Sequence, residues 1–208
     1  MMNIPLFPLG MTLFPEGVAA LKIFEVRYLD MTRASFRDKT PFGIVTLSQG
    51  SEVRQAAQQV SFADIGTLAD IVEFEATQPS LYSIRCRGQS RFKIDSAQQM
   101  PNGLWRADVS VIEDDPSMDI PPELAKSATT LQRVLQSLDE QDIPDDARPI
   151  LKPYRLNDCG WVSNRWAELL NLNPQQKQHL MEIENPRLRL DLVQELLEEM
   201  GAFRPHAD

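Results

Sequence analysis

The residues best suited to covalent chemistry are Cys159 and His179. Cys159 lies in the segment NDCGW, residues 157–161, where we predict the N-terminus of a helix. A helix N-terminus stabilises the thiolate, which is the nucleophilic form of cysteine. His179 is the candidate general base, but it lies on a separate predicted helix and no acidic residue is evident to orient it. We therefore favour a structural role for Cys159 and keep a cysteine-dependent enzyme as an alternative.

Other catalytic and metal-binding patterns are missing from the sequence. Lys126 and Ser127 are adjacent on a predicted helix, where neighbouring side chains point about 100° apart, so they do not form a Ser-Lys dyad. The chain has no GxxxxGK[ST] segment, the loop that cradles phosphates in many ATPases. The two histidines, His179 and His206, and the two cysteines show no metal-ligand spacing. We expect no cofactor and no metal.

A basic cluster lies within residues 81–99, LYSIRCRGQSRFKIDSAQQ. A strip of bases can bind the phosphates of RNA, whereas alternation along a strand would place the same bases on a solvated face. Phe92 is the one aromatic residue in the cluster that could stack on bases. The chain has 30 acidic and 21 basic residues and a formal net charge of −9, which repels nucleic acid. RNA binding stays an alternative; its candidate residues are Arg85, Arg87, Arg91 and Lys93.

The segment FEVRY, residues 24–28, is the candidate binding region. Phe24 and Tyr28 are four residues apart, so on a helix they share one face, and we expect both in the core. Glu25 and Arg27 do not share that face. Their structural interpretation is that Glu25 compensates the helix dipole and Arg27 forms a surface pair with Asp30. Their functional interpretation is that this helix start forms one wall of a peptide-binding cleft.

Short apolar segments broken by turn residues predict a small bent sheet or barrel in the first half of the chain. Phe-Pro-x-Gly occurs at residues 7–10 and again at 14–17, which suits type I turns because proline presets φ. We expect a helix over 24–38 and a long Gln-rich loop over 48–62. The expected strands are 4–6, 11–14, 18–23, 41–47, 65–76, two strands within 81–99 around a turn at Gly88, and 104–114.

An acidic, Pro-rich linker at residues 114–123 leads into a helical second half. Asp and Asn side chains cap helix N-termini, and proline fits the first helical turn. Gly201 suits the end of the last helix. The expected helices begin near Leu124, at Asp158, at Asn173-Pro174 and at Asn185-Pro186. The predicted fold class is α+β, with a β-barrel domain at 1–115 and a helical bundle domain at 116–208.

The composition favours a cytoplasmic protein. Two separate cysteines, Cys86 and Cys159, suggest reduced thiols rather than a disulfide scaffold. The first residues, MMNIPLFPLG, have no basic region of the kind that begins a signal peptide. No apolar run approaches the ~18 residues of a membrane span.

Several segments in order resemble the N-terminal, substrate-binding domain of ATP-dependent Lon proteases. They span nearly the whole chain: IPLFPLGMTLFPEGVAALKIFEVRYLDM…PFGIV at 4–45, IGTLADI at 65–71, GQSRFKI at 88–94 and NPRLRLDLVQELL at 185–197. There are departures from the family pattern. Ala20 and Val26 stand where the family usually has proline, Lys22 replaces a usual arginine, and Asn185 replaces a usual aspartate.

The resemblance implies a PUA-like β pseudo-barrel with one helix, followed by a C-terminal helical bundle. It also implies a non-catalytic recognition module without ATPase or protease parts, like the stand-alone proteins of this family. The partners that it implies are exposed peptide segments or unfolded proteins, with a protease or a chaperone as a further partner. The peptide-contact region to which it points comprises Phe24, Glu25, Arg27 and Tyr28.

Overall fold

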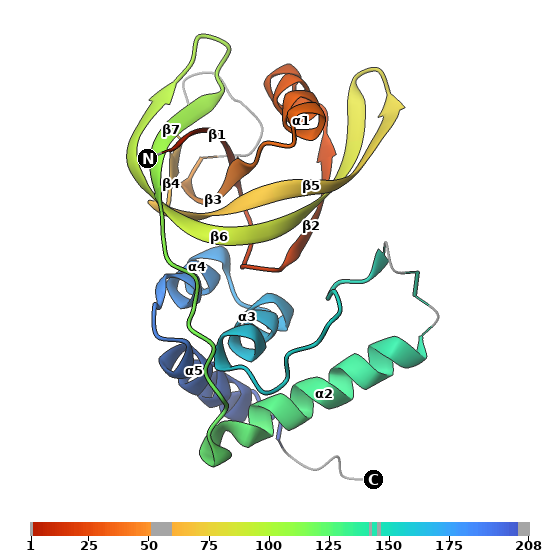
Figure 1. The fold of residues 1–208 in the computed structure, drawn as a ribbon, viewed down its shortest axis with the longest axis vertical. Coiled ribbons are helices and arrows are strands. Elements are labelled where there is room, and N and C mark those ends of the chain that lie inside the picture. The colour runs from red at the N-terminus through yellow and green to blue at the C-terminus, as the bar shows by residue number, and fades with distance from the viewer. Residues whose placement is uncertain (1, 51–59, 142, 145–146, 204–208) are drawn as a thin grey trace. The chain divides into compact units, whose positions relative to one another are not determined.

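The first half of the chain forms a β-sheet that closes on itself (Figure 1). The computed structural model describes residues 2–50, 60–141, 143–144 and 147–203. Its strands are β1 (Met2–Leu9), β2 (Val18–Ile23), β3 (Phe42–Gln49), β4 (Ser61–Phe62), β5 (Ile65–Gln78), β6 (Leu81–Gln99) and β7 (Trp105–Val111). Strands β1, β7, β6, β5 and β3 pair in that order, and a parallel pairing of β1 with β3 completes the circuit. The predicted loop at 48–62 overlaps β3 and β4, and its residues 51–59 lie outside the described residues.

Apolar side chains pack on both sides of this closed sheet. One cluster takes residues from all five strands of the circuit, among them Leu6 and Phe92, and therefore fills the barrel. The next residue of β1, Phe7, belongs to a second cluster outside the barrel, because alternate side chains of a strand point to opposite faces. Helix α1 (Val26–Asp38) covers this second cluster, where the rings of Phe7 and Tyr28 stack with centroids 4.0 Å apart.

The sequence predicted a turn at Gly88. This prediction is wrong, because Gly88 lies within the single 19-residue strand β6. A Cβ at this position would lie 2.3 Å from the backbone oxygen of Phe14. The Gly88 backbone donates to Gly17 O and accepts from Glu16 N, both at 2.9 Å. Glycine is therefore needed here for the close approach of the segment that contains Phe14, and not for chain reversal.

The two Phe-Pro-x-Gly segments do not have the same structure. Pro8 lies inside β1, opposite Val45 of β3, so the predicted first turn is wrong. The second segment is a β-turn, closed by a hydrogen bond from Gly17 N to Phe14 O at 3.0 Å. Glu16 has φ 62, the sign that a type II turn requires at its third residue, so the predicted type I is also wrong. The strand expected at 11–14 does not form.

The second half of the described chain is helical, so the α+β class and the β pseudo-barrel are as predicted, while the C-terminal bundle stays a prediction. The cap signals are confirmed where side chains accept backbone N–H groups. Asp158 Oδ1 accepts from Trp161 N at 2.7 Å, and Asn185 Oδ1 accepts from Leu188 N at 3.1 Å. The helices are the short η1 (Pro122–Leu124), α2 (Ala125–Glu140), α3 (Cys159–Leu169), α4 (Pro174–Glu182) and α5 (Pro186–Glu199).

Arg189 of α5 holds a buried polar cluster together; its side chain is 1% exposed. Nη1 donates to Asp115 Oδ2 at 2.6 Å and to Asn164 Oδ1 at 2.9 Å. Nη2 donates to Asp115 Oδ1 at 3.1 Å and to Ile183 O, and Nε donates to Leu180 O at 3.1 Å. All five guanidinium N–H groups therefore have an acceptor, which is the condition under which a charge can be buried.

By packing, the chain divides into two units, and each is built from two segments. The first unit comprises Met1–Asp114 and Asn173–Gln178, and the second comprises Asp115–Leu172 and His179–Asp208. Within the first unit, Gln178 accepts from Thr46 Oγ1 at 2.6 Å and donates to Ile65 O at 2.9 Å. The predicted boundary between 115 and 116 did not anticipate that a later segment packs with the barrel. The two domains stay a prediction.

Candidate functional site

Strand β2 lies at an edge of the sheet. It pairs antiparallel with β6, from Val18 opposite Arg87 to Ile23 opposite Tyr82. In the part of the chain that the structure describes, no strand pairs with its other side. An open strand edge presents backbone N–H and C=O groups that another extended chain can use.

The chain passes from β2 into α1 through Phe24 and Glu25. Glu25 is the N-cap residue, with extended backbone (φ −80, ψ 132), and its side chain makes no cap hydrogen bond. Phe24 precedes the helix, so it does not share a helical face with Tyr28. It is 55% exposed, and its predicted core position is wrong, whereas Tyr28 is buried as predicted. Val26, at the first helical position, is also exposed.

Arg27 holds Glu25 in place. Arg27 Nη2 lies 3.1 Å from Glu25 Oε2, and Arg27 Nη1 donates to Gly103 O at 2.7 Å. Its guanidinium carbon lies 4.5 Å from the centroid of the Tyr28 ring, and its side chain is only 9% exposed. The expected surface pair with Asp30 is therefore wrong. Residues two apart on a helix point to different faces. Glu25 lies outside the helix, so its side chain can reach Arg27.

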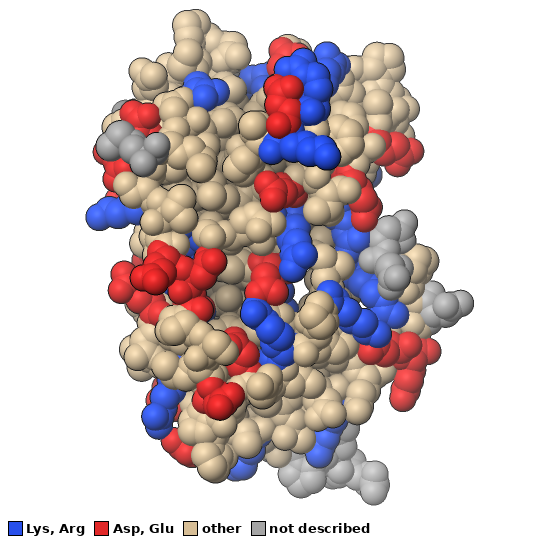
Figure 2. Space-filling view, viewed as in Figure 1, with Lys and Arg blue, Asp and Glu red and all other residues tan. Residues whose placement is uncertain are grey.

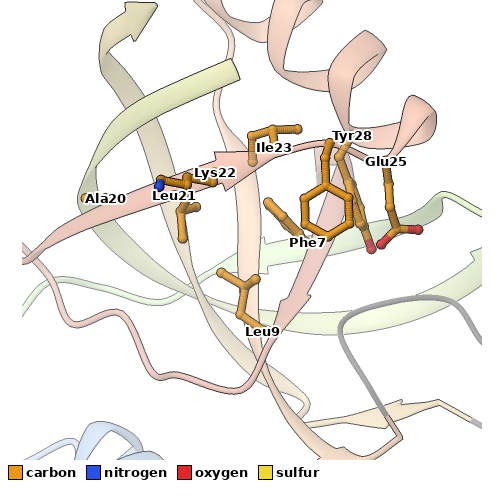
Figure 3. Close-up of a pocket in the computed structure, with 9 residues that line it drawn as sticks. Phe7, Leu9, Ala20, Leu21, Lys22, Ile23, Glu25 and Tyr28 are labelled. Carbon is orange, nitrogen blue, oxygen red and sulfur yellow. The ribbon is translucent and has the colours of Figure 1, made fainter. Parts of the chain in front are cut away.

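An apolar hollow of about 140 Å³ lies where β1, β2 and the start of α1 meet (Figure 3). Pockets for drug-sized ligands occupy roughly 300–1,000 Å³, whereas an apolar cavity of about 150 Å³ can hold benzene. The hollow therefore has the size of one apolar side chain. It is lined by Phe7, Leu9, Ala20, Leu21, Lys22, Ile23, Phe24, Glu25 and Tyr28.

The hollow follows the edge of β2. Four consecutive residues of the strand, Ala20 to Ile23, line it. Successive side chains of a strand point to opposite faces of a sheet, so a space that four consecutive residues line borders the strand backbone as well as its side chains. The open backbone and the apolar hollow are thus parts of one surface.

Two charged groups border this surface. Figure 3 shows the Lys22 nitrogen and the Glu25 carboxylate on opposite sides of the hollow. Lys22 is exposed and forms no ion pair with another described residue. Of the four residues proposed from the sequence, Phe24, Glu25 and Tyr28 line the hollow, and Arg27 supports Glu25 from outside it.

Sequence reasoning missed the strand residues of the hollow. Phe7 and Leu9 come from β1, and residues 20–23 come from β2. An exposed lysine, Lys22, within a short strand was the available signal, since edge strands often carry lysine. Nothing in the sequence predicted that β1 and β2 come close enough to line the same hollow.

The basic cluster of β6 does not form an exposed strip. Arg85 and Arg91 are buried, and Arg85 Nη1 pairs with Glu73 Oε1 at 3.0 Å. Arg87 Nη2 lies 3.7 Å from Glu16 Oε2. Of the four basic residues of the cluster, this leaves Lys93 as the exposed one. Figure 2 shows basic and acidic residues interspersed over the visible face. The sequence suggested either a solvated face or an RNA-contacting strip. Both require exposed bases, so the burial of Arg85 and Arg91 fits neither.

Cys159 lacks the properties of a catalytic nucleophile. It is fully buried at the start of α3, and its Sγ donates to Asp119 O at 3.5 Å. Burial and the negative charge of Asp158 raise the pKa of the Cys159 thiol, which corrects the expected stabilisation of its thiolate. His179 is exposed, and among the described residues no hydrogen bond joins it to Cys159.

We expect iodoacetamide to leave both cysteines of the native protein largely unmodified at pH 7. Burial also raises the pKa of Cys86, to about 12, so the thiolate fraction of both cysteines increases only at alkaline pH. Timed labelling followed by peptide mass spectrometry measures each site, and urea-unfolded protein, where both should react, is the control. Fast, selective labelling of Cys159 at neutral pH would revive the enzyme alternative.

The remaining chemical candidates do not assemble into a site. Ser127 is buried and donates to Gln194 Oε1 at 3.0 Å, a bond between α2 and α5. Within the described ranges, no group of three or more His, Cys, Asp or Glu residues could hold a metal, and His206 lies outside these ranges. Among the described residues, none of the helices combines the length and the apolar character that a membrane span requires.

Comparison with known proteins gives a match over nearly the whole length. A family model described as the ATP-dependent protease La (LON) substrate-binding domain matches residues 3–199. The chain is similar to the crystal structure of a Lon N-terminal domain protein from Xanthomonas campestris, with 29% identity and a TM-score of 0.70 over 99% of this chain and 100% of that one. It also shares the fold of the N-terminal domain of a Mycobacterium avium complex Lon protease, with 18% identity and a TM-score of 0.63 over 95% of this chain and 99% of that one. No curated protein matches it in sequence.

Proposed function

This chain belongs to the family of the ATP-dependent protease La (LON) substrate-binding domain, and from that premise we propose that it is a non-catalytic module that binds exposed, extended segments of other proteins along β2. The observation that carries the proposal is the apolar hollow beside the open edge of that strand. An extended peptide can add to such an edge through its backbone, while the pockets along the edge select its side chains.

One apolar side chain would anchor the peptide. The hollow matches a single ring or branched aliphatic group in size, and its walls include buried Phe7, Leu9 and Tyr28. Phe24 supports the proposal from the rim, because a ring that is 55% exposed has apolar surface left to bury on a ligand. Hydrogen bonds to the β2 backbone would then give affinity with little dependence on sequence.

The alternatives have weaker support. Burial of Arg85 and Arg91 removes half of the basic cluster from any RNA surface. The raised pKa of Cys159 weighs against a cysteine-dependent enzyme. Unfolded proteins in the cytoplasm are the partners that we propose, and a protease or a chaperone that shares them is a further proposed partner.

Peptide binding tests the proposed site. We expect an extended eight-residue peptide with one Phe or Leu to bind the intact protein with a Kd of tens of micromolar, measured by fluorescence anisotropy. The change Phe24→Ala should weaken binding about tenfold, since burial of part of a Phe ring is worth about 1.4 kcal/mol. N-methylation of alternate peptide amides should also weaken binding, because it removes donors to the β2 edge.

The control is Phe36→Ala. Phe36 is an exposed aromatic of α1, 45% exposed and stacked on Phe74, and it does not line the hollow. Equal losses for the two variants would place the peptide elsewhere. Absence of binding by every apolar peptide up to millimolar concentration would contradict the proposed function itself.

A further inference from the structure

The hollow has a fixed carboxylate at its rim, and this feature points to one kind of peptide. We propose that the hollow takes the free amino-terminal end of an extended chain whose first residue is apolar. The side chain of that residue fills the hollow, and its α-ammonium group donates to Glu25. This inference rests on the proposed function and specifies its ligand.

Glu25 is held ready to accept a hydrogen bond. Arg27 Nη2 lies 3.1 Å from Glu25 Oε2, and the Arg27 side chain, which is 9% exposed, donates to Gly103 O and packs on the Tyr28 ring. Among the described residues no group donates a hydrogen bond to Oε1, although the Glu25 side chain is only 19% exposed and lines the hollow. Each carboxylate oxygen has two acceptor positions, so the arginine leaves acceptor capacity unused. A neutral apolar chain laid over this group would bury an unsatisfied acceptor, whereas a cation would satisfy it.

The compact site favours an α-ammonium over a lysine or arginine side chain. In a chain terminus, the cation and the first side chain are attached to the same Cα, so both fit one hollow with a carboxylate in its wall. In an extended peptide, the neighbouring residue points to the opposite face, and the next side chain on the same face is roughly 7 Å away. A basic side chain would therefore need more room than a hollow of about 140 Å³ provides.

The position of Glu25 along the strand also suits a chain start. Glu25 follows the C-terminal end of β2 by two residues. A peptide that adds antiparallel to β2 begins at that end, so its first residue lies next to Glu25. In the reverse direction, the first residue of the peptide would lie at the Val18 end of β2, away from Glu25. The position of Glu25 thus favours the antiparallel orientation.

The test uses two fluorescent peptides that differ in one group. Both have the sequence Phe-Ser-Thr-Gly-Ser-Thr-Gly-Lys with fluorescein on the lysine side chain, one with a free amino terminus and one acetylated. At pH 6.5 we expect the free peptide to bind the intact protein at least tenfold more tightly. An α-amino group has a pKa of about 7.7–8.0, so this advantage should decrease as pH rises through and above that range, because the protonated form is the one that binds. Binding of the acetylated peptide should not change.

A charge-matched pair of variants locates the effect. The change Glu25→Gln should abolish the preference for the free amine, whereas Asp30→Asn, which removes an exposed carboxylate of α1 outside the hollow, should keep it. If the acetylated peptide binds wild-type protein as tightly as the free one, the inference is wrong while the proposed function stands. If neither binds up to millimolar concentration, the inference is wrong, and the proposed function is also wrong if every other apolar peptide fails to bind. The wild-type comparison needs no variant, so impaired folding of Glu25→Gln does not affect it.

Discussion

Replacing Arg189 with methionine is expected to lower the free energy of unfolding of the helical unit by about 3–5 kcal/mol. Methionine approximates the length of the arginine stem but has no N–H donor. Asp115 would lose two charge-assisted hydrogen bonds, and Asn164 Oδ1 and the carbonyls of Leu180 and Ile183 would lose one each. The Asp115 side chain is only 15% exposed, and loss of the arginine that balances its charge accounts for most of the cost.

Urea unfolding followed by tryptophan fluorescence measures this loss. The chain has three tryptophans, of which Trp161 and Trp166 belong to the helical unit. In a Trp105→Phe background, the fluorescence reports on that unit alone. We expect the transition to move to lower urea with an unchanged slope, as for a pure loss of stability.

Arg187→Met is the matched control for Arg189→Met. Arg187 lies two residues earlier on α5 and pairs with Glu123 at 2.8 Å, but both side chains are more than half exposed. Exposed ion pairs contribute about 0–1 kcal/mol, so this variant should unfold close to wild type. If the two substitutions lowered the free energy of unfolding by similar amounts, the buried hydrogen bonds of Arg189 would not be the source of the stability.

Gly88→Ala is expected to destabilise the barrel by roughly 2–4 kcal/mol. The added methyl group would lie 2.3 Å from Phe14 O, and a backbone oxygen cannot turn away as a side chain can. Relief of this overlap would strain the two backbone hydrogen bonds that Gly88 makes with Glu16 and Gly17. The turn that precedes β2 would then be less firmly held to β6.

Cys86, two residues before Gly88, provides the measurement. Its thiol is buried and unreactive, so its alkylation rate in native protein reports how often this part of β6 opens. We expect Gly88→Ala to increase that rate and to lower the urea midpoint of the barrel. The control, Gln89→Ala, introduces the same side chain at an exposed neighbouring position and should stay within about 0.5 kcal/mol of wild type. Unchanged labelling of Cys86 in Gly88→Ala would contradict the role assigned to Gly88.

Features set by nearby residues could be predicted from the sequence. Asp158 and Asn185 cap their helices as expected, because a cap depends on backbone amides two or three residues away. Asn185 accepts from the backbone amides of Arg187 and Leu188, which is the same kind of bond that Asp158 makes with Trp161. The period-2 patterns of β5 and β7 were also sufficient to locate these strands.

Features set by distant residues could not be predicted. Gly88 suggested a turn because its true neighbour, Phe14, is far away in sequence. Cys159 lies at a helix N-terminus as expected, yet burial and Asp158 outweigh the effect of the helix on its pKa. Phe24 was placed on a helical face because the start of the helix was predicted two residues too early. The sequence singled out the FEVRY segment, whose role in binding stays a prediction, but the hollow that this segment borders depends on the approach of β1 to β2.

The position of Asn173–Gln178 limits how this protein can be divided. The barrel unit consists of Met1–Asp114 and of this short segment, and the residues between them belong to the helical unit. A barrel cut from the chain at residue 115 would lack Gln178, and with it the partner of Thr46 and Ile65. Neither unit is therefore formed by one continuous segment of the chain. Fusion proteins, domain exchanges and truncated forms keep an intact barrel only if they also retain, or graft in, the beginning of α4.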